Sequence, residues 1–287
     1  MTAIIMKELR AYFSQMTGYI FLALTTLLVG LFFTFINVFG LNPGFHQVLD
    51  EATLLFLIMI PALTMRLFAD ESRNKTDQLL YTSPLAIWQI VLGKYLAAAL
   101  LFLMGIAVTM LFPLMMSFYG ELPLTQIIGA YVGFVLMGFS FIGIGLLISV
   151  TTENQIIAAV ATFGTVFAFF LMDIIASAMP ADATSSLVFV LIVIVIFAGI
   201  LYNGTKNIFA AIILLAIGIG GTVAMFFSNN LMFDGLIVRM FRWLSMFSRF
   251  NALSRGVLNV ADIVFYFTFS FLLIYLTINF IEKRRWR

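Results

Sequence analysis

Residues 90–118 read IVLGKYLAAALLFLMGIAVTMLFPLMMSF, a stretch of 29 residues whose one charged side chain is Lys94. About 20 apolar residues in a helix are enough to cross the hydrocarbon core of a bilayer. This stretch is longer than that, so it can tilt or bend within a membrane. Pro113 predicts the place of a bend, because proline cannot donate the backbone hydrogen bond that a continuous helix needs.

The rest of the chain has the same character. Hydrophobic side chains make up 63% of the 287 residues and charged side chains 10%, whereas soluble domains are about 25% charged. Eight runs are long and apolar enough to span a membrane: 19–39, 52–68, 90–118, 125–150, 155–176, 186–202, 207–227 and 261–281. The sequence predicts an all-α, polytopic membrane helix bundle of about six to eight transmembrane helices, forming a single transmembrane domain over residues 1–287.

The distribution of Lys and Arg predicts the orientation. With the N-terminus inside, eleven of the 15 basic residues fall in inner loops or tails, and the outer loops 40–51, 119–124 and 177–185 contain none. Inner loops are the ones enriched in Lys and Arg. We therefore expect a multi-pass protein of the cell membrane, of bacterial type, with both termini in the cytoplasm and an even number of spans.

Two segments outside the spans are predicted to lie in the membrane interface. Residues 1–16 place apolar side chains on one helix face and Lys7, Glu8 and Arg10 on another, which indicates an N-terminal interfacial helix. The outer segment 228–260 contains the four remaining arginines, which are Arg239, Arg242, Arg249 and Arg255. On a continuous helix the first three share one face, so we expect an amphipathic helix or a shallow re-entrant element whose arginines reach the headgroups.

Composition and motifs exclude most catalytic chemistry. The chain has no Cys and one His, His46, which argues against thiolate metal sites, His-based metal clusters and a Ser-His triad. Gly93-Lys94 is the one Gly-Lys pair, and Trp88 stands where a phosphate-binding loop needs its first Gly. A formal net charge of +2 does not predict nucleic-acid binding. We expect no cofactor in this chain.

The few charges near the spans leave two alternatives open. Arg66, Lys94 and Asp173 are placed near span ends, where a snorkelling charge is the simplest interpretation. A secondary carrier or channel would need ionisable groups or broken helices near the bilayer midplane. A membrane-embedded lipid-modifying enzyme would have to use His46, Glu153 or Asp173, which are far apart in the chain.

Small residues in the fourth run predict close helix packing. Gly129 and Gly133 form a Gly-x-x-x-Gly step, and Gly138 and Gly145 are two turns apart on the same helix. Such residues allow backbones to approach closely, either inside the bundle or at a dimer seam.

The inner loop 69–89 is the most specific signal. It places Asp70 and Glu71 before Arg73 and Lys75, then adds the apolar pair Leu79-Leu80 and ends at Pro84. A short helix with charges and an apolar edge suits the docking of a cytosolic partner, although a solvated loop has a similar composition.

This loop resembles the corresponding segment of ABC-2-type exporter permeases, most closely the gliding-motility-type branch. The resemblance rests on Glu71, Lys75-Thr76, Leu79-Leu80, Ser83-Pro84 and Gly93-Lys94-Tyr95, with a second match at Phe250, Ser254-Arg255-Gly256, Asp262 and Tyr266. Many family members carry a Gly immediately before the Thr, where this chain has Lys75.

The resemblance implies a function. The segment around Asp70, Glu71, Arg73, Lys75, Thr76, Leu79, Leu80 and Pro84 would be a coupling helix that docks a cytosolic ABC ATP-binding subunit, which would hold ATP and Mg²⁺. The chain would be the non-catalytic permease subunit of an exporter. It would assemble with a second permease copy or a related membrane subunit, in contact with membrane lipid, and in this branch often with an accessory subunit that has an extracytoplasmic domain. The substrate stays open among a lipid, a hydrophobic peptide, an antibiotic and no conventional cargo.

Overall fold

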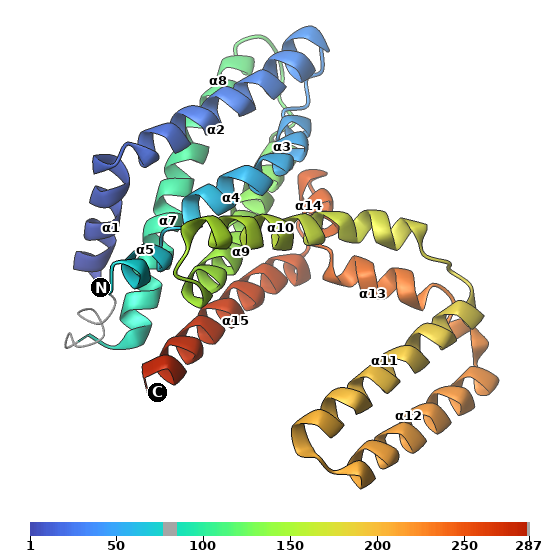
Figure 1. Cartoon of the computed structure of the whole chain (residues 1–287). Helices are drawn as coiled ribbons and strands as arrows, with labels where there is room; N and C mark the ends of the chain where they lie inside the picture. The colour runs from blue at the N-terminus through green and yellow to red at the C-terminus, as the bar shows by residue number, and fades with distance from the viewer. Residues whose placement is uncertain (77–84, 286–287) are drawn as a thin grey trace. The chain divides into compact units, whose positions relative to one another are not determined.

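A computed structural model describes residues 1–76 and 85–285 of the chain (Figure 1). Within these residues the fold is all-α, as predicted. Eight helices are long and apolar enough to cross a membrane, and each overlaps one predicted run: Thr17–Phe39, His46–Arg73, Ile87–Met116, Leu124–Thr151, Gln155–Ala178, Ala183–Gly204, Ile208–Ser228 and Val260–Lys283. The predicted polytopic membrane helix bundle of about six to eight spans is confirmed, with eight candidate spans in the described residues.

The chain divides into two compact units, one of residues 1–169 and 246–287 and the other of residues 170–245. Unit 1 contains α1 (Thr2–Ser14), α2 (Thr17–Phe33), η1 (Thr34–Phe39), α3 (His46–Ala52), η2 (Thr53–Leu55), α4 (Phe56–Thr64), α5 (Ala69–Arg73), α7 (Ile87–Thr109), α8 (Leu111–Met116), α9 (Leu124–Thr151), α14 (Met246–Ser254) and α15 (Val260–Arg285). Helix α10 (Gln155–Ala178) begins in unit 1 and ends in unit 2. Unit 2 continues with α11 (Ala183–Thr205), α12 (Ile208–Ser228), η3 (Asn230–Met232) and α13 (Leu236–Leu244).

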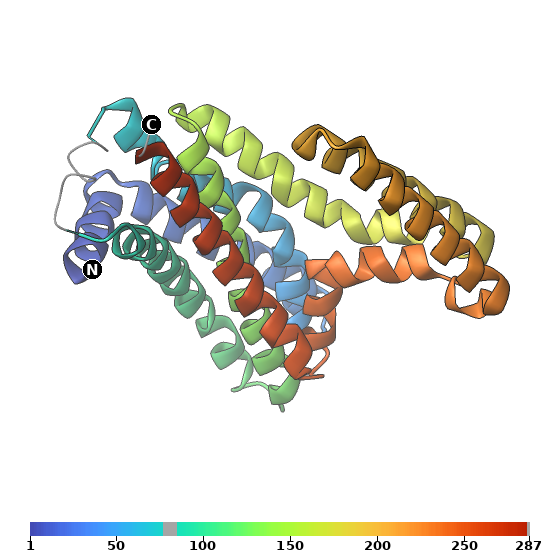
Figure 2. The same ribbon diagram turned by 90° about the horizontal axis from the view of Figure 1, so that it is seen from below.

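Helix α9 is the centre of unit 1. It packs against α4, α7, α14 and α15, and Figure 2 shows α15, in red, running along α9 and α7. The four predicted packing glycines make this possible. A Cβ at Gly129 would overlap the carbonyl oxygen of Leu253 on α14, and one at Gly138 would overlap the ring of Phe102 on α7.

The other two glycines have similar roles. A Cβ at Gly133 would lie 2.9 Å from the Phe250 ring, and one at Gly145 would overlap the side chain of Thr64 on α4. All four glycine faces are therefore covered within the chain, which is the intramolecular alternative of the two that the sequence left open.

Aromatic rings fill the space between these helices. Phe56 lies 4.5 Å from Phe134 and 5.7 Å from Phe141, measured between ring centroids, and Phe102 lies 5.9 Å from Phe56. Such offset and edge-to-face pairs add about 0.5–1.5 kcal/mol each beyond the area that they bury. The rings and the glycines together fix how α4, α7 and α9 are spaced.

The expected bend at Pro113 is confirmed. Helix α7 ends at Thr109 and α8 begins at Leu111, because Pro113 has no N–H to donate to the carbonyl of Thr109. A second irregularity lies at the end of α2, where residues Thr34–Phe39 form a π-helix and the Gly40 N–H bonds the Phe35 carbonyl oxygen five residues back at 3.0 Å.

Unit 2 is built around the antiparallel pair α11 and α12, whose surfaces are apolar on most sides and mostly exposed. Such all-round apolar helices are suited to lipid. Asp182 caps α11 by accepting hydrogen bonds from the Ser185 N–H at 3.0 Å and from the Thr184 and Ser185 hydroxyls. These hydrogen bonds lower the pKa of Asp182 to about 2.

The outer segment departs from the single helix that the sequence predicted. Ser245 adopts an extended ψ of 121° and ends α13, and a new helix, α14, begins at Met246. The prediction that Arg239, Arg242 and Arg249 share one helix face is therefore wrong. Arg239 donates to the carbonyls of Met232 and Asp234 at 2.9 Å each. Arg239, Arg242 and Arg255 are exposed.

Arg249, by contrast, belongs to unit 1 and is paired there with an acidic residue. Its Nη1 lies 2.6 Å from Asp262 Oδ1 on α15, with both side chains about one tenth exposed, and its guanidinium lies 4.0 Å from the centroid of the Phe265 ring. Because the guanidinium of Arg249 is already paired with a buried carboxylate, it is not available to contact a lipid headgroup.

Candidate functional site: a charge cluster between α1, α5 and α7

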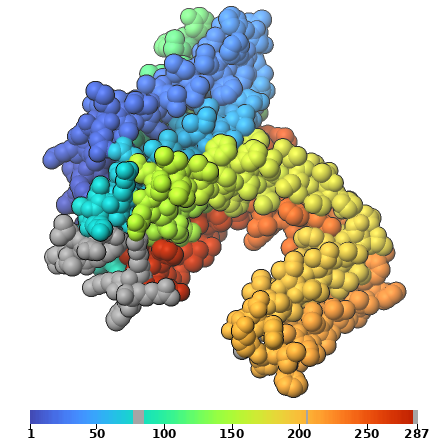
Figure 3. Space-filling model, in the orientation of Figure 1, coloured from blue at the N-terminus to red at the C-terminus, as the bar shows by residue number. Residues whose placement is uncertain are grey.

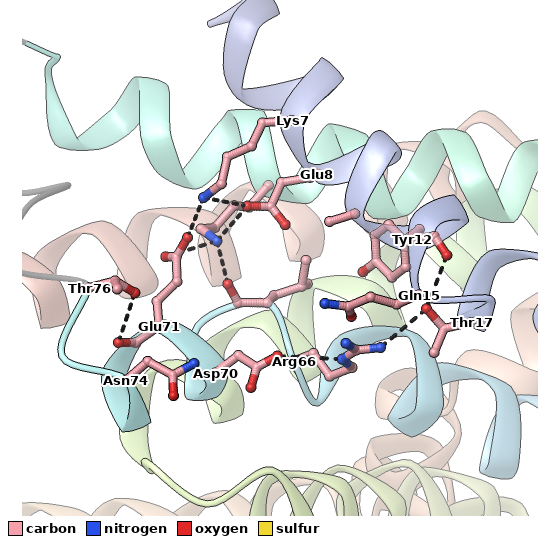
Figure 4. Close-up of a pocket in the computed structure, with 13 residues that line it drawn as sticks. Lys7, Glu8, Tyr12, Gln15, Thr17, Arg66, Asp70, Glu71, Asn74 and Thr76 are labelled. Carbon is pink, nitrogen blue, oxygen red and sulfur yellow. Dashed lines mark hydrogen bonds and ion pairs between the residues drawn. The ribbon is translucent and has the colours of Figure 1, made fainter.

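Four charged side chains from three helices meet at one end of unit 1. Lys7 and Glu8 come from α1, Glu71 from α5 and Lys94 from α7. Figure 4 shows Lys7 and Glu71 reaching toward each other across the space between α1 and α5. We call these four residues the charge cluster. It contains two positive and two negative charges and so has no formal net charge.

Lys94 is the most buried member, with 1% of its side chain exposed. Its ammonium lies 2.9 Å from Glu8 Oε1 and 3.0 Å from Glu71 Oε2, and it donates to the carbonyl oxygen of Leu67 at 2.5 Å. It also lies 5.0 Å from the centroid of the Phe68 ring. The interpretation of Lys94 as a snorkelling charge is wrong. Its ammonium does not reach toward the membrane surface but is buried, and the carboxylates of Glu8 and Glu71 stabilise it in place of water.

Lys7 closes the cluster on its exposed side. Its ammonium donates to Glu71 Oε1 at 2.7 Å and lies 3.5 Å from Glu8 Oε1. Burial, the largest single influence, acts to lower the pKa of Lys7, but the hydrogen bond and charge of Glu71, together with those of Glu8, outweigh it and raise that pKa. Lys7 therefore stays charged throughout the physiological pH range.

Close packing of α1 on α7 brings these groups within reach. Ile4, on the buried face of α1, lies over Gly93, where a Cβ would be 2.9 Å from the Ile4 Cγ2 atom. Because Lys94 follows Gly93, the same contact brings the Lys94 ammonium to Glu8, one turn along α1 from Ile4. The Gly93-Lys94 pair thus has a packing role and an electrostatic role.

Helix α5 is too short to be stable alone, since isolated helices need about 12–15 residues. Its first N–H groups are bonded from outside: Ser149 Oγ on α9 accepts from the N–H of Phe68 at 3.0 Å and of Ala69 at 3.1 Å. Asp70 accepts a hydrogen bond from Gln155 at the start of α10 and lies 3.5 Å from the Arg66 Nε. Helix α5 is therefore held by α1, α7, α9 and α10.

A cavity of about 200 Å³ adjoins the cluster between α1 and the α4–α5 region. In the space-filling view of Figure 3, α1 and α2 in dark blue lie against the cyan surface of that region. Tyr12 lines the cavity and donates to the carbonyl of Leu63 at 2.7 Å, and burial raises the pKa of its hydroxyl. The cavity is small and its wall is largely ionic or hydrogen-bonded, which suits ordered water.

The predicted coupling residues separate into two groups. Asp70 and Glu71 take part in the contacts above, whereas Arg73, Lys75 and Thr76 are exposed. Leu79, Leu80 and Pro84 lie outside the described residues. Lys75 adopts a left-handed φ of 55°, and the Thr76 N–H beyond it bonds the Glu71 carbonyl at 2.9 Å. Glycine adopts that φ without strain, so a glycine at this position would relieve the strained backbone.

Sequence reasoning missed the partners of Glu71. The sequence pattern places Lys7 and Glu8 on a polar helix face and Lys94 at a span end, and it gives no signal for Ser149 or Gln155. One signal was present: Lys94 is the one charge in a 29-residue apolar run, and a charge there needs a partner. The sequence does not say which acid supplies it, because the partners are 86 and 23 positions away.

The residues considered for a lipid-modifying enzyme do not form a site within unit 1. His46 begins α3 beside the Phe45 ring, which stacks on Tyr131 of α9 at 5.9 Å, whereas Glu153 follows the far end of α9. About 20 residues of helix, or roughly 30 Å, separate those levels. Asp173 belongs to unit 2.

Comparison with known proteins now places the chain. The profile of the ABC-2 family transporter proteins matches residues 46–203, which is 158 of the 287 residues. A search of curated proteins gave no match. The matched region runs from α3 to α11 and includes Glu71 and Lys94. Because the match covers more than half of the chain, the chain belongs to the ABC-2 transporter family, as a multi-pass, non-catalytic membrane subunit of an ABC transporter.

Proposed function

We propose that this chain is the permease subunit of an ATP-driven exporter, and that the charge cluster connects its docking segment to the transmembrane helices. The observation that carries the proposal is the position of Glu71. Its carboxylate pairs with Lys7 of α1 and Lys94 of α7 at the point where the chain enters the segment 70–84. A displacement of that segment would therefore act on two other helices at once.

The energy would come from a cytosolic ATP-binding subunit that holds ATP and Mg²⁺. When two such subunits close on ATP, they would push on the exposed side chains of Arg73, Lys75 and Thr76 and on the apolar pair Leu79-Leu80. Effective coupling needs contacts that differ between two states, and it needs a rigid connection between the docking segment and the transmembrane helices. Separating a buried ion pair costs several kcal/mol, so the charge cluster would move as a unit.

Assembly and orientation follow from the same reasoning. The charge cluster and both termini lie at one end of unit 1 (Figures 1 and 2), and we place that end in the cytoplasm because basic residues gather there. We take both units as one permease domain over residues 1–287. A second permease copy or a related subunit would complete the transporter, with an accessory extracytoplasmic subunit if the chain belongs to the gliding-motility-type branch of bacterial exporters.

Docking and transmission are tested separately. The tagged chain is co-purified with candidate cytosolic ATP-binding proteins, and the rate of ATP hydrolysis is measured with and without the chain. We expect Leu79→Ser/Leu80→Ser to abolish co-purification. Glu71→Gln should leave co-purification unchanged and remove the effect of the chain on hydrolysis.

Glu282→Gln is the matched control, because Glu282 is an exposed carboxylate on α15 outside the cluster. It should behave as the wild type in both measurements. Failure of every candidate ATP-binding protein to associate with the wild-type chain would contradict the proposal. So would full coupling in Glu71→Gln.

A further inference from the structure

A second cavity lies at the other end of unit 1 from the charge cluster. Its volume is about 620 Å³, which is in the range of small-molecule sites. It lies between the end of α2 with η1 and the end of α8 with the loop that follows. Lys94 lies on α7, and Met115 of the cavity wall follows 21 residues later on α8, which places the cavity roughly 30 Å from the cluster. Figure 1 shows α8 and the end of α2 together, away from both termini.

Asn37 supplies an unsatisfied polar atom in this cavity. Its side chain lines the wall, the residue is 8% exposed, and Oδ1 has no hydrogen-bond partner among the described residues. The amide Nδ2 donates to the carbonyl oxygen of Asn42 at 2.5 Å, and that acceptor fixes the orientation of the amide. A buried carbonyl oxygen without a partner costs about 1–3 kcal/mol, so a ligand that donates a hydrogen bond would recover this cost.

The backbone around Asn37 is irregular in two independent ways. Asn37 lies within the π-helix η1, and such turns occur frequently at functional sites. Leu41, which also lines the cavity, has a left-handed φ of 50°. A non-glycine residue in that region carries strain of about 1–2 kcal/mol. The π-helical turn and the left-handed Leu41 both lie at the same wall of the cavity.

The lining indicates which chemistry would bind. The cavity contains a second acceptor, the exposed carboxylate of Glu121, and the described residues that line it include no Lys, Arg or His. The remaining wall is mainly apolar, with Phe33, Val38, Met115 and Met116. Two acceptors, one of them negatively charged, favour a cationic N–H donor, and the apolar wall favours a hydrocarbon body.

The surroundings give access from a membrane. The exposed rings next to the cavity include Phe39, Phe118 and Tyr119, the last with 91% of its surface accessible. Tyrosine is enriched where a membrane meets water, and the two exposed phenylalanine rings are suited to lipid. A ligand would thus meet the acceptors at headgroup level, with its tail along the apolar wall.

We propose that this cavity binds a membrane amphiphile with a primary ammonium headgroup, whose N–H bonds Asn37 Oδ1 and whose charge is paired by Glu121. The site is separate from the coupling machinery, so it does not depend on the exporter function. A quaternary ammonium headgroup has the same charge and no N–H, and it would leave Asn37 unsatisfied. The N–H donor is therefore what the site discriminates.

The test uses two lipids with the same tails, phosphate and formal headgroup charge, one with N–H donors and one with three N-methyl groups in their place. The full chain in detergent is titrated with dioleoyl-phosphatidylethanolamine or dioleoyl-phosphatidylcholine, and bound lipid is counted by native mass spectrometry. One hydrogen bond from a charged donor predicts roughly tenfold tighter binding of the ethanolamine lipid. Glycerophosphoethanolamine, which has the headgroup and no tails, serves as competitor and should compete weakly.

Variants locate the site. Asn37→Leu should reduce the preference to about one while both lipids still bind. Glu121→Gln should weaken the binding of both lipids roughly threefold and leave the preference unchanged, because both headgroups carry the charge that Glu121 pairs. Met115→Trp should block binding by filling the cavity. Leu114→Trp is its matched control, because Leu114 is as exposed as Met115 and lies outside the lining.

Three results would overturn the proposal. Equal binding of the two lipids to the wild type would remove the role of the N–H donor. Wild-type affinity for both lipids in Glu121→Gln and in Met115→Trp would place the site elsewhere, and these two exposed positions keep the proposal falsifiable if Asn37→Leu does not fold. Strong competition by the tail-free headgroup would show a site for a soluble amine.

Discussion

Replacing Lys94 with Met removes the charge that lies between two carboxylates. At separations of 2.9 and 3.0 Å and an effective dielectric constant of about 20, each attraction is about 5–6 kcal/mol before desolvation is subtracted. Desolvation offsets most of this in the wild type. In Lys94→Met, however, Glu8 and Glu71 stay partly buried with Lys7 as their one remaining partner in the cluster, so we expect a loss of about 3–5 kcal/mol in the free energy of unfolding.

The double variant Glu71→Gln/Lys94→Met provides the decisive comparison. It leaves Lys7 and Glu8, which form a neutral pair, so it should recover at least about 2 kcal/mol of the loss. Asp70→Asn is the control, because Asp70 is about one third exposed and its pair with Arg66 is 3.5 Å long, and it should cost less than about 1 kcal/mol. Stability is measured by denaturant unfolding in detergent, followed by circular dichroism.

The reasoning would be refuted if Lys94→Met cost no more than Asp70→Asn. It would also fail if the double variant were destabilised by the sum of its two single changes, since independent sites add and coupled sites do not.

Three further predictions concern other parts of the chain. Gly129→Ala forces a Cβ into the backbone of α14 and should lower the free energy of unfolding by about 1–3 kcal/mol, whereas Gly164→Ala, where the space is open, should raise it by up to about 1 kcal/mol; equal effects would contradict this. Lys75→Gly relieves a left-handed φ and should slow hydrogen exchange of the turn by a factor that corresponds to about 1 kcal/mol; faster exchange would contradict it. The pKa of Asp182 is lowered from 3.8 to about 2 in the fold, so its capping of α11 is complete above pH 3.8 and lost as the pH falls through about 2. The protection factor of the Ser185 amide, which is its exchange rate relative to the unfolded chain at the same pH, should therefore fall over that window, and a constant protection factor would refute the cap.

The fold could be predicted to a large extent because membrane spans are encoded locally. A continuous apolar run satisfies its own backbone hydrogen bonds wherever it lies, so residues 90–118 predict a helix, and Pro113 its break, without knowledge of neighbours. The break at Ser245 was not predicted, because the helical projection that aligned Arg239 with Arg249 assumed one continuous helix. The pairing of Arg249 with Asp262 depends on how α14 meets α15, which periodicity does not encode.

The candidate site was predictable in part for the same reason. Glu71 can be identified from sequence because it lies in a charged loop between two apolar runs, and this difference in composition is visible locally. Lys94, Glu8 and Lys7 needed tertiary information: their meeting depends on Gly93 allowing α1 to approach α7, and no pattern within either helix reports that contact. Ion pairs between different helices of a bundle are therefore the contacts that are hardest to predict from the sequence pattern of each helix alone.

The neutrality of the charge cluster has a consequence for the response of the protein to membrane voltage. Moving one unpaired elementary charge through a potential of 100 mV involves about 2.3 kcal/mol of electrical work. Two positive and two negative side chains that move together involve almost no net electrical work, whatever fraction of the membrane potential they cross. A conformational change built on this cluster should therefore proceed at nearly the same rate in an energised and in a depolarised membrane.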